Sequence, residues 1–362
     1  MFSEYFGPDL GPADFVAMAD RGALAKFKKV AAKHRAKGVA PPAEDRDAAR
    51  RFLEVQIGCA HYAVPMLRKV LEATQKMHHA AYTMALTGIS VEPQFAAYTE
   101  RASEAAAAAE AAHGPSPAQQ SADVDALYAC AAAIAPRFLA FLEALAAKTR
   151  GTELVKAEKV KAEGAGAIRS LVGGRKTRVL VLKNEERVLE KTGLVADAAA
   201  RYDTSRVCDV VRGGLEYGSV SELLQVLAML LACDNSLGLE HQLDKSNTRE
   251  QLLGGAGSAI VVTRVKDRFR KPTSGGWADT MVNFYFADDA NRHICELQLC
   301  HARLMTVRKE QGAHHGYAQF RTALELLEAV GETVEEEEEG EEPFGIEAPP
   351  VEVWGKGANA KT

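Results

Sequence analysis

The chain has 362 residues, a formal net charge of −5 and a hydrophobic fraction of 47%. This length is enough for two domains with a sizeable core. The negative net charge excludes a protein that binds bulk nucleic acid through its overall charge. The sequence shows no signal-peptide pattern and no apolar run of about 18 residues, so it predicts a cytoplasmic protein that does not enter a membrane.

The first 150 residues are predicted to be helical. Residues 1–44 form a basic arm whose helix spans Phe15 to Lys37, and its lysines give either a solvated face or a docking face for an anionic partner. Residues 45–150 are rich in alanine and predict a helical bundle. Pro65 is expected to kink or end a helix. Ser121 or Asp123 is expected to cap a helix that stops at Gly151.

Residues 151–330 change to glycine turns and β-branched runs, which predict an α+β domain with a mixed sheet and flanking helices. Ser219 and Glu222 stand at capping-box spacing at the start of one helix. The acidic residues 331–362 predict a disordered tail. The expected strands cover residues 178–183, 206–217, 258–269, 280–286 and 293–299, and the expected helices cover 184–199, 219–232 and 305–330.

Two carboxylates interrupt strand-like apolar runs. Asp209 lies in VCDVV, where a buried charge is costly unless it is paired or holds a cation, and an ion pair with Arg206 or Arg212 is the structural alternative. Glu296 lies in ICELQL, where alternation puts it on one face with Gln298. Two such carboxylates on adjacent strands could share one Mg²⁺, or one could accept a proton, whereas a solvated face remains the alternative for Glu296.

A basic loop follows the run 258–269. Lys266 and Lys271 stand next to the pair Gly275-Gly276, which permits close backbone approach to a ligand. Trp277 follows at once and offers a ring on which a base can stack. Core packing of the tryptophan and plain solubility of the lysines are the alternatives. Charge and a stacking surface within one loop together indicate a nucleotide site.

Several motifs agree with one known family: an aspartate followed by an arginine (Asp209, Arg212), the pair Lys266-Asp267, the loop from Lys271 to Trp277, the strand Glu296 to Leu299, and KEQGAHHGYAQFR. On these motifs, residues of about 175–325 resemble the nucleotidyltransferase-fold synthetase domain of the RelA/SpoT family. Residues 54–57 also read EVQI, but their flanks have helical period, so we assign them to a helix.

The resemblance implies transfer of pyrophosphate from ATP to the 3′ oxygen of GDP or GTP. It implies Mg²⁺ at Asp209, with Glu296 as the catalytic carboxylate and a second candidate for the metal. The remaining implied nucleotide contacts are Lys183 and Lys191 for ATP, and Arg212, Lys266, Lys271, Trp277 and Gln298. Arg187, or alternatively Arg178, is the candidate to replace the ATP-binding arginine of the family, which this chain lacks at its expected position.

The chain departs from the family pattern at Val181, where the family has an arginine, and at Met281, where it has a histidine. Asp279 adds a negative charge two residues after Trp277. The sequence contains no His-Asp dipeptide, so the hydrolase half of bifunctional members is expected to be absent. An inactive member of the fold that binds a nucleotide or a protein, and a scaffold with helical and acidic binding segments, remain alternatives.

Overall fold

The computed structural model describes residues 22–154, 157–160, 177–239, 243–255, 258–310 and 313–332. The start of the predicted arm, before residue 22, and the predicted acidic tail, from residue 333, lie outside the described residues. The helices are α3 (Gly22–Arg35), α4 (Ala43–Ser90), α5 (Phe95–His113), α6 (Val124–Thr149), α7 (Glu185–Gly193), α8 (Val220–Ala232), α9 (Lys245–Leu253), α10 (Ala302–Glu310) and α11 (Ala313–Ala329). The strands are β1 (Thr152–Glu153), β2 (Ala157–Val160), β3 (Thr177–Leu180), β4 (Arg212–Tyr217), β5 (Ile260–Asp267), β6 (Thr280–Phe286) and β7 (Cys295–His301), and two 3-10 turns cover Ala198–Ala200 and Thr204–Arg206.

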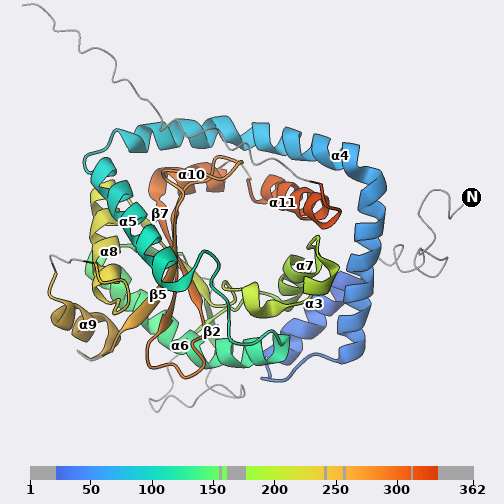
Figure 1. The fold of residues 1–362 in the computed structure, drawn as a ribbon, viewed down its shortest axis with the longest axis horizontal. Coiled ribbons are helices and arrows are strands. Elements are labelled where there is room, and N and C mark those ends of the chain that lie inside the picture. Colours follow the sequence, from blue (N-terminus) through green and yellow to red (C-terminus); the bar gives the residue numbers. More distant parts are fainter. Residues whose placement is uncertain are drawn as a thin grey trace, which may run out of the picture.

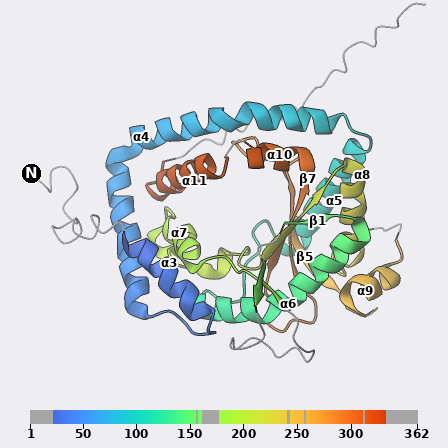
Figure 2. The same cartoon turned by 180° about the vertical axis from the view of Figure 1, so that it is seen from behind.

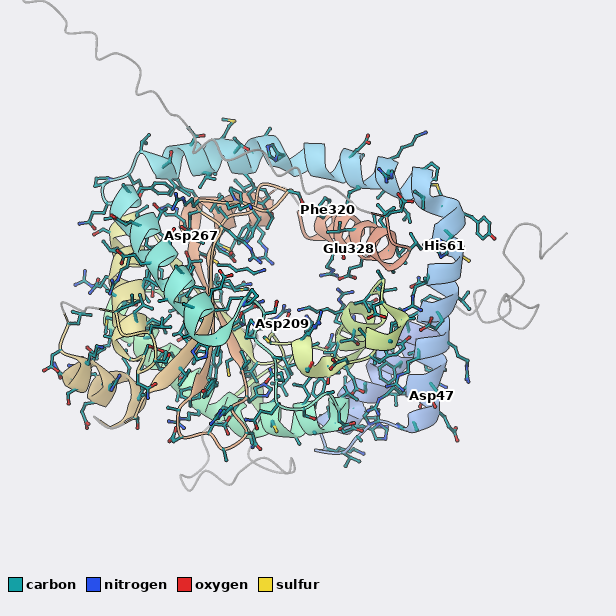
Figure 3. All side chains as sticks on the ribbon, viewed as in Figure 1. Asp47, His61, Asp209, Asp267, Phe320 and Glu328 are labelled. Carbon is teal, nitrogen blue, oxygen red and sulfur yellow. The ribbon has the colours of Figure 1, made fainter. Side chains whose placement is uncertain are left out.

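The elements are arranged as a closed ring (Figure 1), and the view from behind shows the same arrangement (Figure 2). The long helix α4 forms two sides of this ring and turns a corner close to His61 (Figure 3). Pro65 follows His61 by one helical turn, and a proline removes one hydrogen bond of the helical ladder. The helix nevertheless continues to Ser90, so Pro65 accompanies a bend and does not end the helix.

The main sheet has five strands in the order β1-β4-β7-β6-β5. Strands β4 and β7 are parallel, and the pairs β1–β4, β6–β7 and β5–β6 are antiparallel. The predicted class of a mixed sheet with flanking helices is therefore confirmed. Two expected strands are corrected: residues 206–211 are not strand, and β3 pairs with β2 in a separate two-stranded sheet.

One face of the sheet is apolar and forms the main core. Phe284 and Phe286 of β6 pack against Phe141 of α6 with ring centroids 5.6 and 6.0 Å apart. Helices α5 and α8 contribute to the same continuous cluster of buried side chains. Helices from the first 150 residues and the sheet therefore share one core, although the composition suggests a boundary near residue 150.

Helix α6 is the one helix, among the described residues, that is long and apolar enough to cross a membrane. Half of its apolar window is buried inside the protein, and Phe138 and Leu142 are fully covered. The helix begins at the predicted cap, since Asp123 accepts a hydrogen bond from the amide of Ala126 at 2.8 Å. This burial is that of a core helix.

The opposite face of the sheet carries polar side chains in register. Arg212 of β4 lies opposite Glu296 of β7, which lies opposite Asn283 of β6. The next row contains Gln298, Met281 and Lys266, and Arg264 lies opposite Asn283 on β5. We call this set the polar face; it consists of Arg212, Arg264, Lys266, Asn283, Glu296 and Gln298. Side chains alternate along a strand. The apolar face and the polar face are therefore built from alternate residues of the same strands.

Helices α3, α4 and α7 meet in a second core. Phe27 of α3 and Leu53 of α4 pack with Leu189 of α7. Farther along α4, Leu71 packs with Leu327 of α11. These contacts hold α7 and α11 against the long helix, on the side of the ring away from α5 and α8 (Figure 1).

Candidate functional site

Asp209 lies in the segment that leads into β4, three residues before the strand begins, and not within a strand as predicted. Its carboxylate is 2.5 Å from Lys183 Nζ and 3.3 Å from Lys191 Nζ. Arg212 Nη1 is 3.6 Å away. The structural alternative of an arginine pair is therefore only partly right, because two lysines are nearer: Lys183, two residues before α7, and Lys191, in its last turn. In Figure 3, Asp209 lies on the inner side of the ring.

These contacts affect the two partners differently. Burial alone would raise the pKa of Asp209, but Lys183, Lys191 and Arg212 together hold it well below the usual range. Burial lowers the pKa of Lys183 to about 8, even though Asp209 opposes this shift. Besides burial, the difference has an electrostatic cause: Asp209 is attracted by three cations, whereas Lys183 is repelled by Lys191 and Arg212.

Glu296 occupies the position on β7 directly beside Arg212. Its backbone amide donates to the carbonyl oxygen of Val211 at 2.9 Å, and its Oε1 accepts a hydrogen bond from Gln298 Nε2 at 3.1 Å. Burial, the largest cause, and the negative charge of Asp209 together raise the pKa of Glu296 to about 6. The two carboxylates, 87 residues apart in sequence, thus lie in one electrostatic environment.

Two members of the polar face are absent from the residues that the sequence singled out. Asn283 is fully buried, and its Oδ1 accepts hydrogen bonds from Arg264 Nε at 3.0 Å and Nη2 at 2.8 Å. The sequence could have predicted the position of both residues. Alternation in VVTRVKD and TMVNFYF puts Arg264 on the same face as Lys266, and Asn283 on the same face as Met281. They extend the polar face from the carboxylates toward the edge strand.

Trp277 packs against helices and does not stand free in its loop. Its ring lies edge-on to Tyr82 of α4 with centroids 5.6 Å apart, and the guanidinium of Arg308 lies 5.1 Å from its centroid. Gly276 has a φ of +82°, and a Cβ there would stand 3.0 Å from the Cβ of Tyr82. The predicted close approach at the glycine is real, but the partner is α4. The alternative interpretation of Trp277, that it packs in the core, is therefore correct for the part of the ring that contacts Tyr82.

The other predicted loop residues lie at the exposed end of this region. Lys266 and Lys271 are both exposed, and Lys266 belongs to the polar face on the row of Gln298. Asp279 is fully buried and accepts a hydrogen bond from Arg268 Nη1 at 2.9 Å. That pair balances the negative charge that Asp279 adds two residues after Trp277. Met281 is buried on the row of Gln298, which leaves this position of the polar face without a hydrogen-bonding group.

Arg187 faces a different neighbour from the one expected. Its guanidinium pairs with Glu190 and, at 3.0 Å, with Glu325 of α11. Arg187 thus ties α7 to α11. Lys183, just before α7, and Lys191, in its last turn, contact the Asp209 carboxylate, and Arg187 does not.

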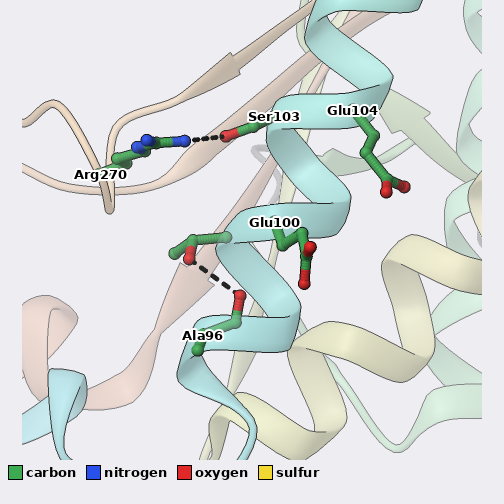
Figure 4. Close-up of a pocket in the computed structure, with 6 residues that line it drawn as sticks. Ala96, Glu100, Ser103, Glu104 and Arg270 are labelled. Atoms are coloured by element: carbon green, nitrogen blue, oxygen red, sulfur yellow. Dashed lines mark hydrogen bonds between the residues drawn. The ribbon is translucent and has the colours of Figure 1, made fainter.

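Two hollows lie near these elements. A hollow of about 330 Å³ is lined by Lys191, Thr192 and Val207, among others, and adjoins the lysine that contacts Asp209. A second, of about 600 Å³, is an open depression on α5 where Arg270 Nη1 donates to Ser103 Oγ at 3.2 Å (Figure 4). Glu100 and Glu104 also line it, so it suits no phosphate and is not part of the candidate site.

Comparison of the chain with protein-family models, with curated proteins and with solved structures found no match. The candidate site therefore stands on geometry alone. Six of the predicted residues come together on it: Lys183, Lys191, Asp209, Arg212, Glu296 and Gln298. Trp277 and Arg187 are held by other partners.

Proposed function

We propose that this protein transfers pyrophosphate from ATP to the 3′ oxygen of GDP or GTP, on a nucleotidyltransferase-type sheet. One observation carries the proposal: Asp209 and Glu296 share one electrostatic environment beside Lys183, Lys191 and Arg212. Three cations accompany two carboxylates, so a polyphosphate would find a net positive surface. The resemblance to RelA/SpoT synthetases along residues of about 175–325 supplies the reaction type.

Glu296 is suited to accept the proton of the acceptor. Its pKa of about 6 lies below neutrality, so at pH 7 to 8 the carboxylate is mostly ionised and still basic. The 3′ oxygen of the guanosine nucleotide forms a bond to the β-phosphorus of ATP as its proton passes to Glu296. The bond between the β-phosphorus and the oxygen that bridges to the α-phosphorus breaks, and AMP leaves with that oxygen.

Lys183 and Lys191 are the side chains that would bind the ATP phosphates. Both already hold a carboxylate, Asp209, and phosphate oxygens are acceptors of the same kind and of higher charge. Binding of ATP would therefore exchange part of the lysine–carboxylate contact for lysine–phosphate contact. Arg187 supports α7 through Glu325 of α11.

Mg²⁺ fits the donor set at this site. Asp209 and Glu296 offer carboxylate oxygens, which Mg²⁺ prefers. Within the described parts of the chain, no group of three or more His, Cys, Asp and Glu side chains could hold a metal ion. Phosphate and water would therefore complete the shell, as is usual for Mg²⁺ at nucleotide sites. When bound, the ion would neutralise phosphate charge.

The acceptor nucleotide would lie across the remaining polar face. Lys266 is exposed at the edge of that face, and Gln298 lies between it and the carboxylates. Lys271 would add charge from the loop. In this proposal guanine stacks on the Trp277 ring in place of, or opposite, the guanidinium of Arg308. The cytoplasm, where we place the protein, supplies both nucleotides.

A direct assay tests the proposal. The full chain is incubated with γ-labelled ATP, GDP or GTP, and MgCl₂, and the products are separated by anion exchange. We expect a guanosine product that carries the label on its 3′ oxygen, and stoichiometric AMP. The variant Lys183→Met is expected to lower the rate by at least about 100-fold, because phosphate charge loses its nearest buried counter-charge.

The assay also separates the main alternative. A non-catalytic binding protein of this fold is favoured by the way Lys183 and Lys191 already satisfy Asp209. Saturable binding of the fluorescent nucleotides mant-ATP or mant-GDP without any transfer of label would establish that alternative and end the enzymatic proposal. Absence of both binding and transfer would end both.

A further inference from the structure

A cluster of four charged side chains, of which only Asp125 is more than a third exposed, lies at the start of α7. Glu185, the first residue of that helix, has no exposed side-chain surface. Its Oε2 accepts hydrogen bonds from Arg35 Nε at 2.8 Å, and its Oε1 accepts from Arg46 Nε at 2.9 Å. Arg35 is the last residue of α3, and Arg46 lies in the first turn of α4. The last residue of α3 and the first turn of α4 thus bind the same carboxylate.

Asp125, in the first turn of α6, completes the cluster. Its Oδ1 lies 2.5 Å from Arg35 Nη2 and 2.8 Å from Arg46 Nη2. The guanidinium carbon of Arg35 also lies 4.5 Å from the centroid of the Tyr128 ring. Two arginines and two carboxylates balance in charge, and four helices (α3, α4, α6 and α7) meet at this point.

The cluster connects to the lysines of the candidate site. The Tyr128 hydroxyl donates to the backbone carbonyl oxygen of Lys183 at 2.5 Å. The amide of Lys183 donates to the carbonyl oxygen of Val210 at 3.0 Å, next to Asp209. Leu189 packs α7 onto α3 and α4 from the same side as the cluster. The N-terminal helices therefore hold the start of α7, while Lys183, two residues before the helix, and Lys191, within it, both contact Asp209.

Such a cluster is a poor way to gain stability. Buried ion pairs recover their desolvation cost only with good geometry, and well-packed apolar residues often do as well or better. What two arginines around one carboxylate do provide is direction, because the guanidinium has a fixed planar arrangement of donors. A helix start that is held from two sides keeps a fixed position and rotation.

We propose that Arg35 and Arg46 are positioning residues, which through Glu185 fix the start of α7 and so place the ammonium groups of Lys183 and Lys191 for the triphosphate of ATP. The inference rests on the proposed function for its ligand. It assigns a role in ATP affinity to α3 and α4, in which the sequence analysis placed no catalytic or nucleotide-binding residue. Acceptor binding, on the far side of the polar face, does not depend on this cluster.

The test uses the full chain and two probes, mant-ATP and mant-GDP, in equilibrium titrations with MgCl₂. Arg46→Lys keeps the charge and loses the paired donors, and Arg46→Met removes both. Lys183→Met marks the ATP site itself. Arg137→Met is the matched control, because Arg137 also pairs with an aspartate, Asp288, at 2.7 Å and lies 4.3 Å from the centroid of a ring, Phe286. Amide hydrogen exchange of residues 183–193 is measured on every variant.

We expect Arg46→Lys and Arg46→Met to weaken mant-ATP binding by about 10- to 100-fold, the usual effect of a displaced binding group. In these variants the affinity for mant-GDP stays at the wild-type value, and amide exchange of residues 183–193 becomes faster. The control Arg137→Met changes neither of the two affinities nor the exchange rate. Arg46→Lys gives the result even where Arg46→Met fails to fold.

A loss of mant-ATP affinity in Lys183→Met but not in the Arg46 variants would overturn the positioning role and leave the proposed function intact. A wild-type protein that binds neither probe would overturn the proposed function. In that case the exchange data decide: unchanged exchange across 183–193 in Arg46→Lys refutes the mechanical link, and faster exchange confined to that segment upholds it with another ligand.

Discussion

Glu296→Gln is expected to be more stable than the wild-type protein at pH 8 and to form no measurable pyrophosphorylated product. Glutamine keeps the shape of the side chain and its hydrogen bond with Gln298, but it cannot ionise or accept the acceptor proton. Loss of a general base typically lowers a rate by about 10²- to 10⁴-fold. A gain in stability with a loss of activity is the pattern of a side chain retained for chemistry.

The stability change has a defined sign and pH window. The pKa of Glu296 is raised by burial and by Asp209 to about 6, from an ordinary value of 4.5. The folded protein therefore binds more protons than the unfolded chain between these values, and its stability falls as pH rises through them. The shift corresponds to about 2 kcal/mol, which the wild-type protein has lost at pH 8 and Glu296→Gln has not.

Urea denaturation of both proteins at pH 4 and pH 8 measures the effect. The free energies of unfolding should agree within error at pH 4, where Glu296 is protonated in both states, and should differ at pH 8 in favour of the variant. Equal destabilisation of the variant at both values would show that Glu296 is an ordinary structural carboxylate. Full activity in the variant would remove it from the reaction.

Asp209→Asn is expected to destabilise the protein by about 3–5 kcal/mol at pH 7, because it leaves a nearly buried ammonium without its counter-charge. Lys183 is 9% exposed and has Asp209 Oδ2 at 2.5 Å. The pKa of Asp209 lies well below its usual range, since the cations overcome the effect of burial. The stability that this shift contributes is present above the ordinary value of 3.8 and is lost as pH falls toward the folded value.

Two further variants make this prediction specific. Asp209→Asn combined with Lys183→Met removes both members of the buried pair and should recover a large part of the loss. Asp288→Asn breaks the pair with Arg137, whose side chains are 62% and 33% exposed, and should cost less than about 1 kcal/mol. Guanidinium denaturation followed by circular dichroism gives all three values. A double variant no more stable than Asp209→Asn would contradict the pairing.

Local features of the sequence predicted local features of the fold. Ser219 and Glu222 form the expected capping box, with the Ser219 hydroxyl accepting from the Glu222 amide at 3.3 Å. Residues 280–286 form β6 as expected, and EVQI at 54–57 is helical, as its flanks indicated. The alternation in ICELQL placed Glu296 and Gln298 on one face. Each of these features depends only on residues that are close in sequence, within a turn or two of one helix or within one strand.

Partners distant in sequence could not be predicted in the same way. Nothing near Asp209 indicates that Lys183 would reach it before Arg212 does, because that depends on where α7 packs. The partner of Gly276 and Trp277 is Tyr82, almost two hundred residues away, on a helix that continues past Pro65. Likewise, the contact of Arg35 and Arg46 with Glu185 arises from helix packing, which a periodic pattern does not specify.

The convergence of Asp209 and Glu296 in one electrostatic site can be measured directly. Carboxyl ¹³C resonances give the pKa of Glu296 in the wild-type protein, in Lys191→Met and in Asp209→Asn. We predict a value of about 6 in the wild type, a higher value when Lys191 is removed, and a lower one when Asp209 loses its charge. A Glu296 that titrates at its ordinary value in all three proteins would contradict the shared site and the function built on it.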